Sequence, residues 1–503
     1  MKRKFIQLLI AGLAFGSLQS CIKDKGDYEY NYGNEVTIRY ATYSYTVFLA
    51  DTLTVTPLRT FANPQGDTTD YDHAWYINGE QYSDAPVLKY AGKAIGSTSV
   101  YYYMIDRKSG IWFPAASSFT INTSSPFAAG WGILYEKDNE SELAHVRING
   151  TSFVDYKDLY KTYNNGESMG SAPVKIRDYA VSSGRGMYVL QRGGPGPLEL
   201  DANGFSKKLV AKDAFTAGAP AGFEPVDMAF FGTADLLVNK DGTLYSRTFP
   251  SGALPFATPW FSTPVQYTRG LKISDIWDSW SRNATFSIMH DELNNRLLTM
   301  SFNIGTNPSG GIPIRDIPAP VTPYPEEYSP LNNLGNWDYV WGGTFNDASG
   351  LMDGAMLLRS PADSKLYWQT FQIQVTGNND ARVTPKTRVL FQGNNLVTDK
   401  SILKTVKTRG YLFFTAGADN KQLYYYDNIS GQPVVKYTEF SSPITAIEPA
   451  EDGMTMAIGL EDGTFLIYDI SNEVIISGVP KELHRYGGLG KVVDIIVKGG
   501  KTS

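Results

Sequence analysis

The stretch "MTMAIGLEDGTFLIYDIS", residues 454–471, decides the fold class of this chain. An apolar run passes through a polar turn at Asp462-Gly463 into a second apolar run that carries aromatic side chains. Two such runs joined by an Asp-Gly pair are typical of antiparallel strands with a two-residue loop. The stretch therefore predicts a β-hairpin. Turns of the same kind are expected at Asp241-Gly242, Asp419-Asn420 and Asp462-Gly463.

The same hairpin pattern occurs seven times in the second part of the chain. The hairpins begin at residues 131, 186, 235, 285, 354, 410 and 454. A short strand precedes most of them and a fourth strand follows several, which is the layout of β-propeller blades. The stretch "KVVDIIV" (491–497) looks like another first strand without a hairpin, whereas the hairpin at Trp131 has no strand before it. We therefore expect a seven-bladed propeller over residues 126–503, closed by the C-terminal strand.

Residues 34–124 have a different strand pattern and predict a small Ig-like β-sandwich. Trp75 lies in the middle of an expected strand and is predicted to be a core residue, and Asn78-Gly79 is an expected hairpin turn. An aromatic strand follows at residues 101–105, and residues 122–126 predict a linker. The whole chain is therefore expected to be all-β, with the sandwich preceding the propeller.

The beginning of the chain has the features of a bacterial lipoprotein signal. Residues 2–4 are basic, an apolar run follows, and Ser20 directly precedes Cys21, the single cysteine of 503 residues. An apolar run of this length is too short to span a bilayer, and cysteine at the cleavage point resembles a lipobox. We expect residues 1–20 to be a signal peptide, Cys21 to be lipidated and residues 21–33 to form a tether.

Composition and motifs argue against several classes of function. The formal net charge of −6 leaves no basic surface of the kind that nucleic acid requires, so no nucleic-acid partner is expected. The four histidines are far apart and form no metal motif, so neither a metal nor another cofactor is expected. The G-x-S-x-G match at residues 166–170 lacks the context of a nucleophile elbow, and no catalytic residue is predicted. A carboxylate pair in the propeller channel, as in a hydrolase or lyase, stays open as an alternative.

Aromatic residues in two neighbouring blades form the predicted ligand site. They lie in residues 274–281 and 335–343, on either side of the Pro-rich insertion 303–330. Aromatic rings at a propeller face can stack on sugar rings or peptide side chains, and nearby aspartates can accept hydrogen bonds. The candidate residues are Trp277, Trp280, Trp337, Tyr339, Trp341, Asp275, Asp278 and Asp338. Packing between blades is the alternative role, because strand alternation places at least half of these side chains inside.

The segment "CIKDKGDYEY" (21–30), the strand "AWYINGE" (74–80) and the divergent propeller resemble the PKD-like surface lipoproteins of Bacteroidota. The resemblance implies a lipid-anchored protein of the outer membrane that faces the cell exterior and assists a TonB-dependent SusC/SusD-like transporter pair. It implies non-catalytic binding or scaffolding in the capture of oligopeptides or glycans, with a slight preference for peptides. A surface hydrolase or lyase and a purely structural subunit are the alternative functions.

Overall fold

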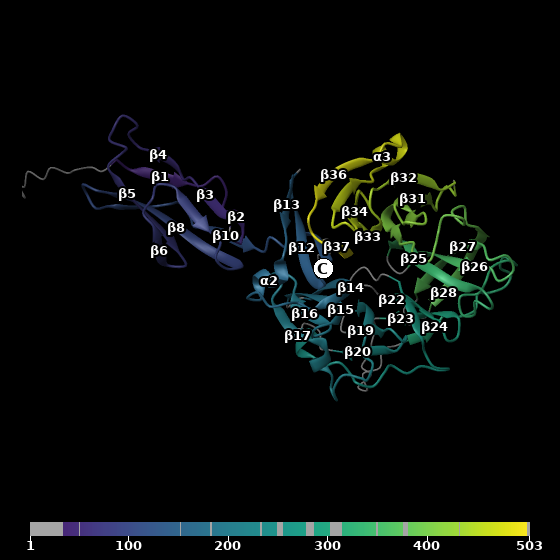
Figure 1. Ribbon diagram of the computed structural model, residues 1–503. Helices are drawn as coiled ribbons and strands as arrows, with labels where there is room; N and C mark the ends of the chain where they lie inside the picture. Colours follow the sequence, from purple (N-terminus) through teal and green to yellow (C-terminus); the bar gives the residue numbers. More distant parts are fainter. Residues whose placement is uncertain are drawn as a thin grey trace, which may run out of the picture. The chain divides into compact units, whose positions relative to one another are not determined.

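The computed structural model describes residues 34–49, 51–150, 152–181, 184–231, 234–248, 255–277, 286–301, 314–348, 351–375, 381–431 and 433–499. The chain divides into two compact units, Met1–Ser124 and Ser125–Ser503, and both are built from strands (Figure 1). The expected signal peptide, Cys21 and the tether lie outside the described residues. Among the helices that are described, none has the length and apolar character needed to cross a membrane. The all-β prediction is confirmed for the described part of the chain.

The first unit packs short strands around one aromatic core. Its strands are β1 (Val36–Arg39), β2 (Ser44–Phe48), β3 (Thr52–Val55), β4 (Leu58–Phe61), β5 (Tyr71–Ile77), β6 (Glu80–Ser83), β7 (Leu88–Ala91), β8 (Gly96–Asp106), β9 (Trp112–Pro114) and β10 (Phe119–Ser124). The main sheet has the order β2-β10-β8-β5-β6 with β9 beside β8, and β1–β4 and β3–β7 form two further pairs. Trp75 on β5 is fully buried, as predicted, and its ring lies 4.2 Å from that of Tyr102. Asn78 and Gly79 connect β5 to β6 with positive φ, which confirms the predicted turn.

The linker predicted at residues 122–126 is mostly strand. Strand β10 continues to Ser124 and pairs with β2 on one side and β8 on the other. Phe127 already belongs to the core of the second unit, with 2% of its surface exposed. The polar side chains in this segment suggested a loop, but two neighbouring strands satisfy its backbone hydrogen bonds, so the strand persists.

The second unit is a series of antiparallel sheets. The first sheet contains β11 (Gly130–Lys137), β12 (Glu140–Asn149), β13 (Ser152–Tyr156) and β37 (Lys491–Lys498). The second contains β14 (Ser171–Val181), β15 (Gly184–Gly193), β16 (Leu198–Asp201) and β17 (Lys207–Val210). The third contains β18 (Pro225–Phe231), β19 (Ala234–Asn239) and β20 (Leu244–Thr248). The next two contain β21 (Ile273–Ile276), β22 (Phe286–Asp291), β23 (Arg296–Ser301) and β24 (Ile314–Asp316); and β25 (Asp338–Ala348), β26 (Leu351–Arg359), β27 (Leu366–Val375) and β28 (Ala381–Leu390). The last two contain β29 (Leu403–Val406), β30 (Tyr411–Ala416), β31 (Gln422–Asp427) and β32 (Val435–Glu439); and β33 (Ile444–Pro449), β34 (Thr455–Leu460), β35 (Phe465–Asp469) and β36 (Lys481–Tyr486). Short helices α2 (Leu159–Tyr163) and α3 (Asn472–Ser477) lie in connections, as do the 3₁₀ turns η2 (Ala211–Ala214), η3 (Pro255–Ala257) and η4 (Lys407–Arg409). Within the described residues the third sheet has three strands where four are expected.

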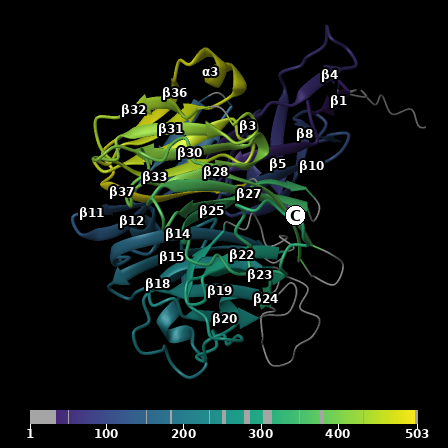
Figure 2. The same ribbon diagram turned by 90° about the vertical axis from the view of Figure 1, so that its right-hand side faces the viewer.

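The last strand of the chain pairs with the first strand of the second unit. Strand β37 runs antiparallel to β11, with Trp131 opposite Val497 and Ile133 opposite Ile495. It also lies against β14 and β33, the first strands of the second and last sheets (Figures 1 and 2). The C-terminal strand therefore joins the sheet that lacks a first strand of its own, as the sequence predicts.

A hydrophobic cluster lies between each pair of consecutive sheets. For example, one cluster joins Tyr188 of the second sheet to Met228 of the third. A further cluster contains Trp131 and Phe465 and joins the last sheet to the first. Burying a side chain of this size is worth about 1.5–3 kcal/mol, so packing between sheets supplies much of the stability of the unit.

The three turns predicted at Asp241-Gly242, Asp419-Asn420 and Asp462-Gly463 contain more than two residues. A two-residue loop of the expected type needs positive φ at both positions, but at Asp241-Gly242 only the glycine has it, with φ of 85°. Residues 240–243 connect β19 to β20, and Gly242 N donates to Asn239 O at 2.9 Å. Asp241 Oδ1 accepts a hydrogen bond from Thr243 N at 2.9 Å, so the aspartate stabilises the turn through its side chain. The connections at residues 417–421 and 461–464 are likewise longer than two residues.

Candidate binding site

Three of the predicted site residues form a chain of hydrogen bonds between the sheets that begin with β21 and β25. Trp277 Nε1 donates to Tyr339 Oη at 2.7 Å, and Tyr339 Oη donates to Asp275 Oδ2 at 2.6 Å. Trp277 is only 2% exposed and packs in the cluster that contains Phe371. The burial of Trp277 favours packing, the alternative role, over ligand contact.

A buried histidine extends this chain. The His290 ring stacks on Tyr339, with 4.1 Å between ring centroids and 16° between planes, and His290 Nδ1 lies 2.6 Å from Ser274 Oγ. Burial lowers the pKa of His290, and burial together with the Asp275 carboxylate raises the pKa of Tyr339 well above its usual value. Both rings are therefore neutral near pH 7. Their arrangement holds two sheets together.

The other predicted aromatic residues also contact protein side chains. The Arg388 guanidinium lies 4.0 Å from the Trp337 ring centroid, and Tyr367 contacts the same ring edge-on. Trp341 stacks on Trp368 with 6.0 Å between centroids. The remaining predicted residues are Asp338, which is exposed, and Trp280 and Asp278, which lie outside the described residues. The described aromatic residues thus pack against other side chains of the protein and do not form a free surface for a ligand.

A polar cavity of about 450 Å³, here called the amide pocket, lies at the sheet that contains β22, β23 and β24. It is lined by Arg269, Asn294, Asp316, Ile317, Pro318, Asn332 and Asn333. The Pro-rich insertion supplies three of these residues, so the pocket lies in the predicted region although the predicted residues do not line it. The lining has amide donors and acceptors, a carboxylate and a guanidinium, and little apolar surface. Such a set suits a hydrophilic ligand with several hydrogen-bonding groups.

Two copies of a Leu-Asn-Asn sequence build the amide pocket, at residues 293–295 and 331–333. Leu297 N donates to Leu331 O at 2.7 Å, and Leu334 N donates to Asn295 O at 2.9 Å, so the two segments run side by side. Leu331 and Leu334 are buried, which leaves the neighbouring asparagines at the pocket. The repeated Leu-Asn-Asn is the sequence signal that could have indicated this site.

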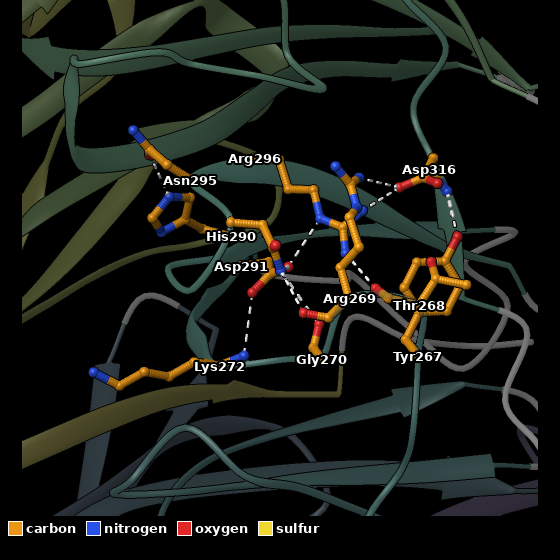
Figure 3. A network of polar contacts seen from close by, with 11 residues as sticks. Tyr267, Thr268, Arg269, Gly270, Lys272, His290, Asp291, Asn295, Arg296 and Asp316 are labelled. Carbon is orange, nitrogen blue, oxygen red and sulfur yellow. Dashed lines mark hydrogen bonds and ion pairs between the residues drawn. The ribbon is translucent and has the colours of Figure 1, made fainter.

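A polar network fixes the walls of the amide pocket (Figure 3). Arg296 is fully buried, and its Nε donates to Asp291 Oδ2 at 2.9 Å. Its Nη1 donates to Asp316 Oδ1 at 2.5 Å and its Nη2 donates to Thr268 O at 3.1 Å. Arg269 lies 3.6 Å from the same Asp316 oxygen, but its side chain is 60% exposed. The network therefore separates a buried structural arginine from an exposed one that a ligand can reach.

The alternative function as a hydrolase or lyase requires a pair of carboxylates, and carboxylates do occur on the first strands of the sheets. Asp227 on β18 lies 2.5 Å from Lys175 Nζ and 3.2 Å from Arg177 Nη2. Burial alone would raise the pKa of Asp227, but the two cations hold it below its usual range. Glu448 on β33 pairs with Lys404 at 2.9 Å. Both carboxylates are therefore paired with cations.

In the described ranges, no three His, Cys, Asp or Glu residues are grouped in a way that could hold a metal ion.

Comparison with known proteins relates one part of the chain to a family. Residues 21–173 match the model of the PKD-like family. The match begins at Cys21 and continues beyond the first unit, through β11, β12 and β13, to the start of β14. No curated protein sequence matches the chain.

Several solved structures are similar in fold. A quinonprotein alcohol dehydrogenase-like protein from Bacteroides thetaiotaomicron is 14% identical, with a TM-score of 0.40, and covers 91% of this chain and 97% of its own. A periplasmic gluconolactonase from Pseudomonas aeruginosa is 11% identical, with a TM-score of 0.46, and covers 74% of this chain and 99% of its own. The WD40 domain of Sif2 is 11% identical, with a TM-score of 0.38, and covers 75% of this chain and 91% of its own.

Proposed function

We propose that this protein is a non-catalytic binding lipoprotein of the outer membrane, which faces the cell exterior and captures oligomeric nutrients for a SusC/SusD-like transporter pair. The lipobox-like sequence at Cys21 supports the anchoring part of the proposal. The amide pocket is the observation that carries the binding part.

The binding unit is, in this proposal, a seven-bladed β-propeller that β37 closes. Its sheets follow one another along the chain, and a hydrophobic cluster containing Trp131 and Phe465 joins the last sheet to the first. The pairing of β37 with β11 supports closure in the same way. A closed ring removes exposed sheet edges, which gives the pocket a rigid support.

A glycan fits the amide pocket better than a peptide does. Asn294, Asn332 and Asn333 offer both donors and acceptors, which suit the hydroxyl groups of a sugar. Ile317 and Pro318 are the apolar residues of the lining, and they give little room for an apolar peptide side chain. The cation pairing of Asp227 and Glu448 favours binding over hydrolysis.

Isothermal titration of the purified protein with neutral oligosaccharides and with oligopeptides tests the amide pocket. We expect Asn332→Ala and Arg269→Ala to weaken glycan binding about tenfold, because each removes hydrogen bonds to a ligand without disturbing a buried group. Asn395→Ala is the matched control, since this asparagine is exposed and does not line the pocket. Wild-type binding by both pocket variants, or binding of peptides alone, would reject glycan capture at this site.

The transporter partner needs a separate measurement. A native pull-down from outer membranes, with Cys21 intact, is expected to recover a SusC/SusD-like pair together with this protein. Recovery of the protein without any transporter would leave the pocket proposal standing and remove the assignment to an uptake complex.

A further inference from the structure

The main sheet of the first unit presents a row of aromatic side chains on its outer face, here called the aromatic stripe and defined as Tyr76, Tyr101, Tyr103 and Trp112. Tyr101 and Tyr103 alternate along β8 with the core residue Tyr102, so they point away from the core. Tyr76 on β5 lies directly opposite Tyr101 on β8. Trp112 on β9 lies opposite Ile105, which is two residues after Tyr103 on β8. Three neighbouring strands therefore contribute to one continuous row.

The Tyr103 ring contacts the rings of Tyr76 and Trp112, and the aromatic stripe is only partly covered. Ring centroids are 5.7 Å apart for Tyr76 and Tyr103 and 5.5 Å apart for Tyr103 and Trp112, with edge-to-face geometry. Trp112 is 49% exposed and Tyr101 is 43% exposed. Ala74, which lies opposite Tyr103, is only 2% exposed, so the small residue allows the rings to lie on the sheet. Contacts between the rings limit their rotamers before any ligand binds.

The polar tips of the aromatic stripe are left for a ligand. Among the described residues, the Trp112 indole N–H and the hydroxyl groups of Tyr76, Tyr101 and Tyr103 have no hydrogen-bond partner. Polar uncharged side chains continue the same face, where Ser97 Oγ donates to Asn122 Oδ1 at 2.7 Å. Rings with free hydroxyl groups beside amide and hydroxyl side chains match the alternating C–H and O–H surfaces of a sugar.

The charges around the aromatic stripe favour an uncharged ligand. Asp72 and Arg107 border the stripe beside Trp112, and they form an ion pair of 2.8 Å, so neither charge is available alone. The four stripe residues are three tyrosines and a tryptophan, and they include no carboxylate, ammonium or guanidinium group. A neutral ligand therefore fits this face better than an acidic or basic one.

The small area of the aromatic stripe favours a small ligand over a protein partner. A stable protein interface uses about 20–30 residues on each side, and four rings with their polar neighbours are a fraction of that number. We propose that the aromatic stripe is a glycan-binding site for a neutral oligosaccharide chain, separate from the amide pocket. The rings stack on sugar faces, and the free hydroxyl and indole groups bond to sugar hydroxyls.

Affinity electrophoresis and calorimetry of the full chain test this site, with xyloglucan, laminarin and yeast mannan as neutral probes and polygalacturonate as the acidic one. We expect at least one neutral glycan to bind. Trp112→Ala and Tyr101→Ala are expected to lower its affinity by about tenfold or more, because aromatic anchors often dominate a contact surface. Trp112→Phe is expected to keep most of the affinity, since it keeps a ring.

Tyr82→Ala is the matched control for these variants. Tyr82 is 37% exposed, but its ring lies 5.9 Å from Tyr90 on β7 and does not join the stripe. The proposal is overturned if no neutral glycan binds, if only polygalacturonate binds, or if stripe variants that melt like wild type bind like it. Loss of transporter recovery with unchanged glycan binding would instead assign the stripe to a protein partner. Weakening by Asn332→Ala alone would reject the stripe and leave the amide pocket in place.

Discussion

Arg296 tests whether the polar network beside the amide pocket is structural. Its guanidinium is fully buried and donates to two carboxylates and a backbone carbonyl. Removing one member of a buried ion pair leaves the other charge without its partner in a poorly solvated site, which costs about 3–5 kcal/mol. We therefore predict that Arg296→Met lowers the free energy of unfolding by about 3 kcal/mol, measured by chemical denaturation.

Arg269 is the matched control for that prediction. It pairs with the same Asp316, but its side chain is 60% exposed, and exposed ion pairs contribute about 0–1 kcal/mol. Arg269→Met should therefore change stability by less than 1 kcal/mol. Equal stability of the two variants would show that the buried network does not hold this part of the second unit together.

The proximity of single residues could be predicted from the sequence, but the orientation of their side chains could not. The sequence indicates that tryptophans of two adjacent sheets lie close together, and Trp277 and Tyr339 are indeed hydrogen-bonded. It does not show which side of the strand each ring occupies, because an irregular register occurs between Tyr339 and Trp341. Arg269 was missed because a single polar residue in a loop carries no periodic signal.

At the scale of elements, β37 contains a buried amine whose titration affects stability. Lys498 lies within the second unit, with 2% of its surface exposed, and its Nζ donates to the Ala202 carbonyl. Burial lowers the pKa of Lys498 from 10.5 to about 7, with Asp178 and Asp201 acting against this shift and Arg185 adding to it. The folded chain then binds fewer protons than the unfolded chain between about pH 7 and 10.5, so stability rises with pH in that window.

We predict that Lys498→Met removes this pH dependence. In wild type the free energy of unfolding should rise by up to about 1.4 kcal/mol per pH unit from this group between pH 7 and 9, and the variant should lose that slope. Lys491→Met on the same strand is the control, because that side chain is 47% exposed. Chemical denaturation at several pH values measures the slope, and an unchanged slope in Lys498→Met would contradict the assignment.

Hairpins were predictable as elements because their apolar runs are long and their turns carry Asp, Asn or Gly. The detailed turn type was not predictable, since Asp241 acts through its side chain and only Gly242 adopts positive φ. The linker expected at residues 122–126 failed for a related reason. Its composition is polar, but pairing with β2 and β8 outweighs local preference.

At the scale of the whole molecule, the order of the sheets could be predicted from repeated hairpins and an unpartnered last strand. The cluster that joins the last sheet to the first could not, because packing between distant segments leaves no local pattern. The same limit applies to the amide pocket, whose walls come from residues 269–333. Its shape depends on hydrogen bonds between two loops that the sequence does not pair.

The proposed closure of the second unit leads to a prediction about its C-terminal strand. Deleting residues 489–503 removes Leu489, Val492, Ile495 and Ile496 from two hydrophobic clusters. Burial of such side chains is worth about 1.5–3 kcal/mol each, and the sum approaches the total stability of an ordinary domain. The deletion also exposes the edges of β11 and its neighbours. We therefore expect the whole unit to lose stability together.

A deletion of residues 500–503 is the control, because it leaves β37 complete. Melting followed by circular dichroism should show a large drop for the longer deletion and none for the control. Hydrogen exchange in β22 and β23, which lie in a sheet that does not pair with β37, separates the two possible results. Faster exchange there means that the ring opens as one cooperative unit, since each sheet depends on packing against both neighbours. An unchanged melting temperature, or faster exchange confined to β11 and β12, would show that β37 only covers one edge and does not close the ring.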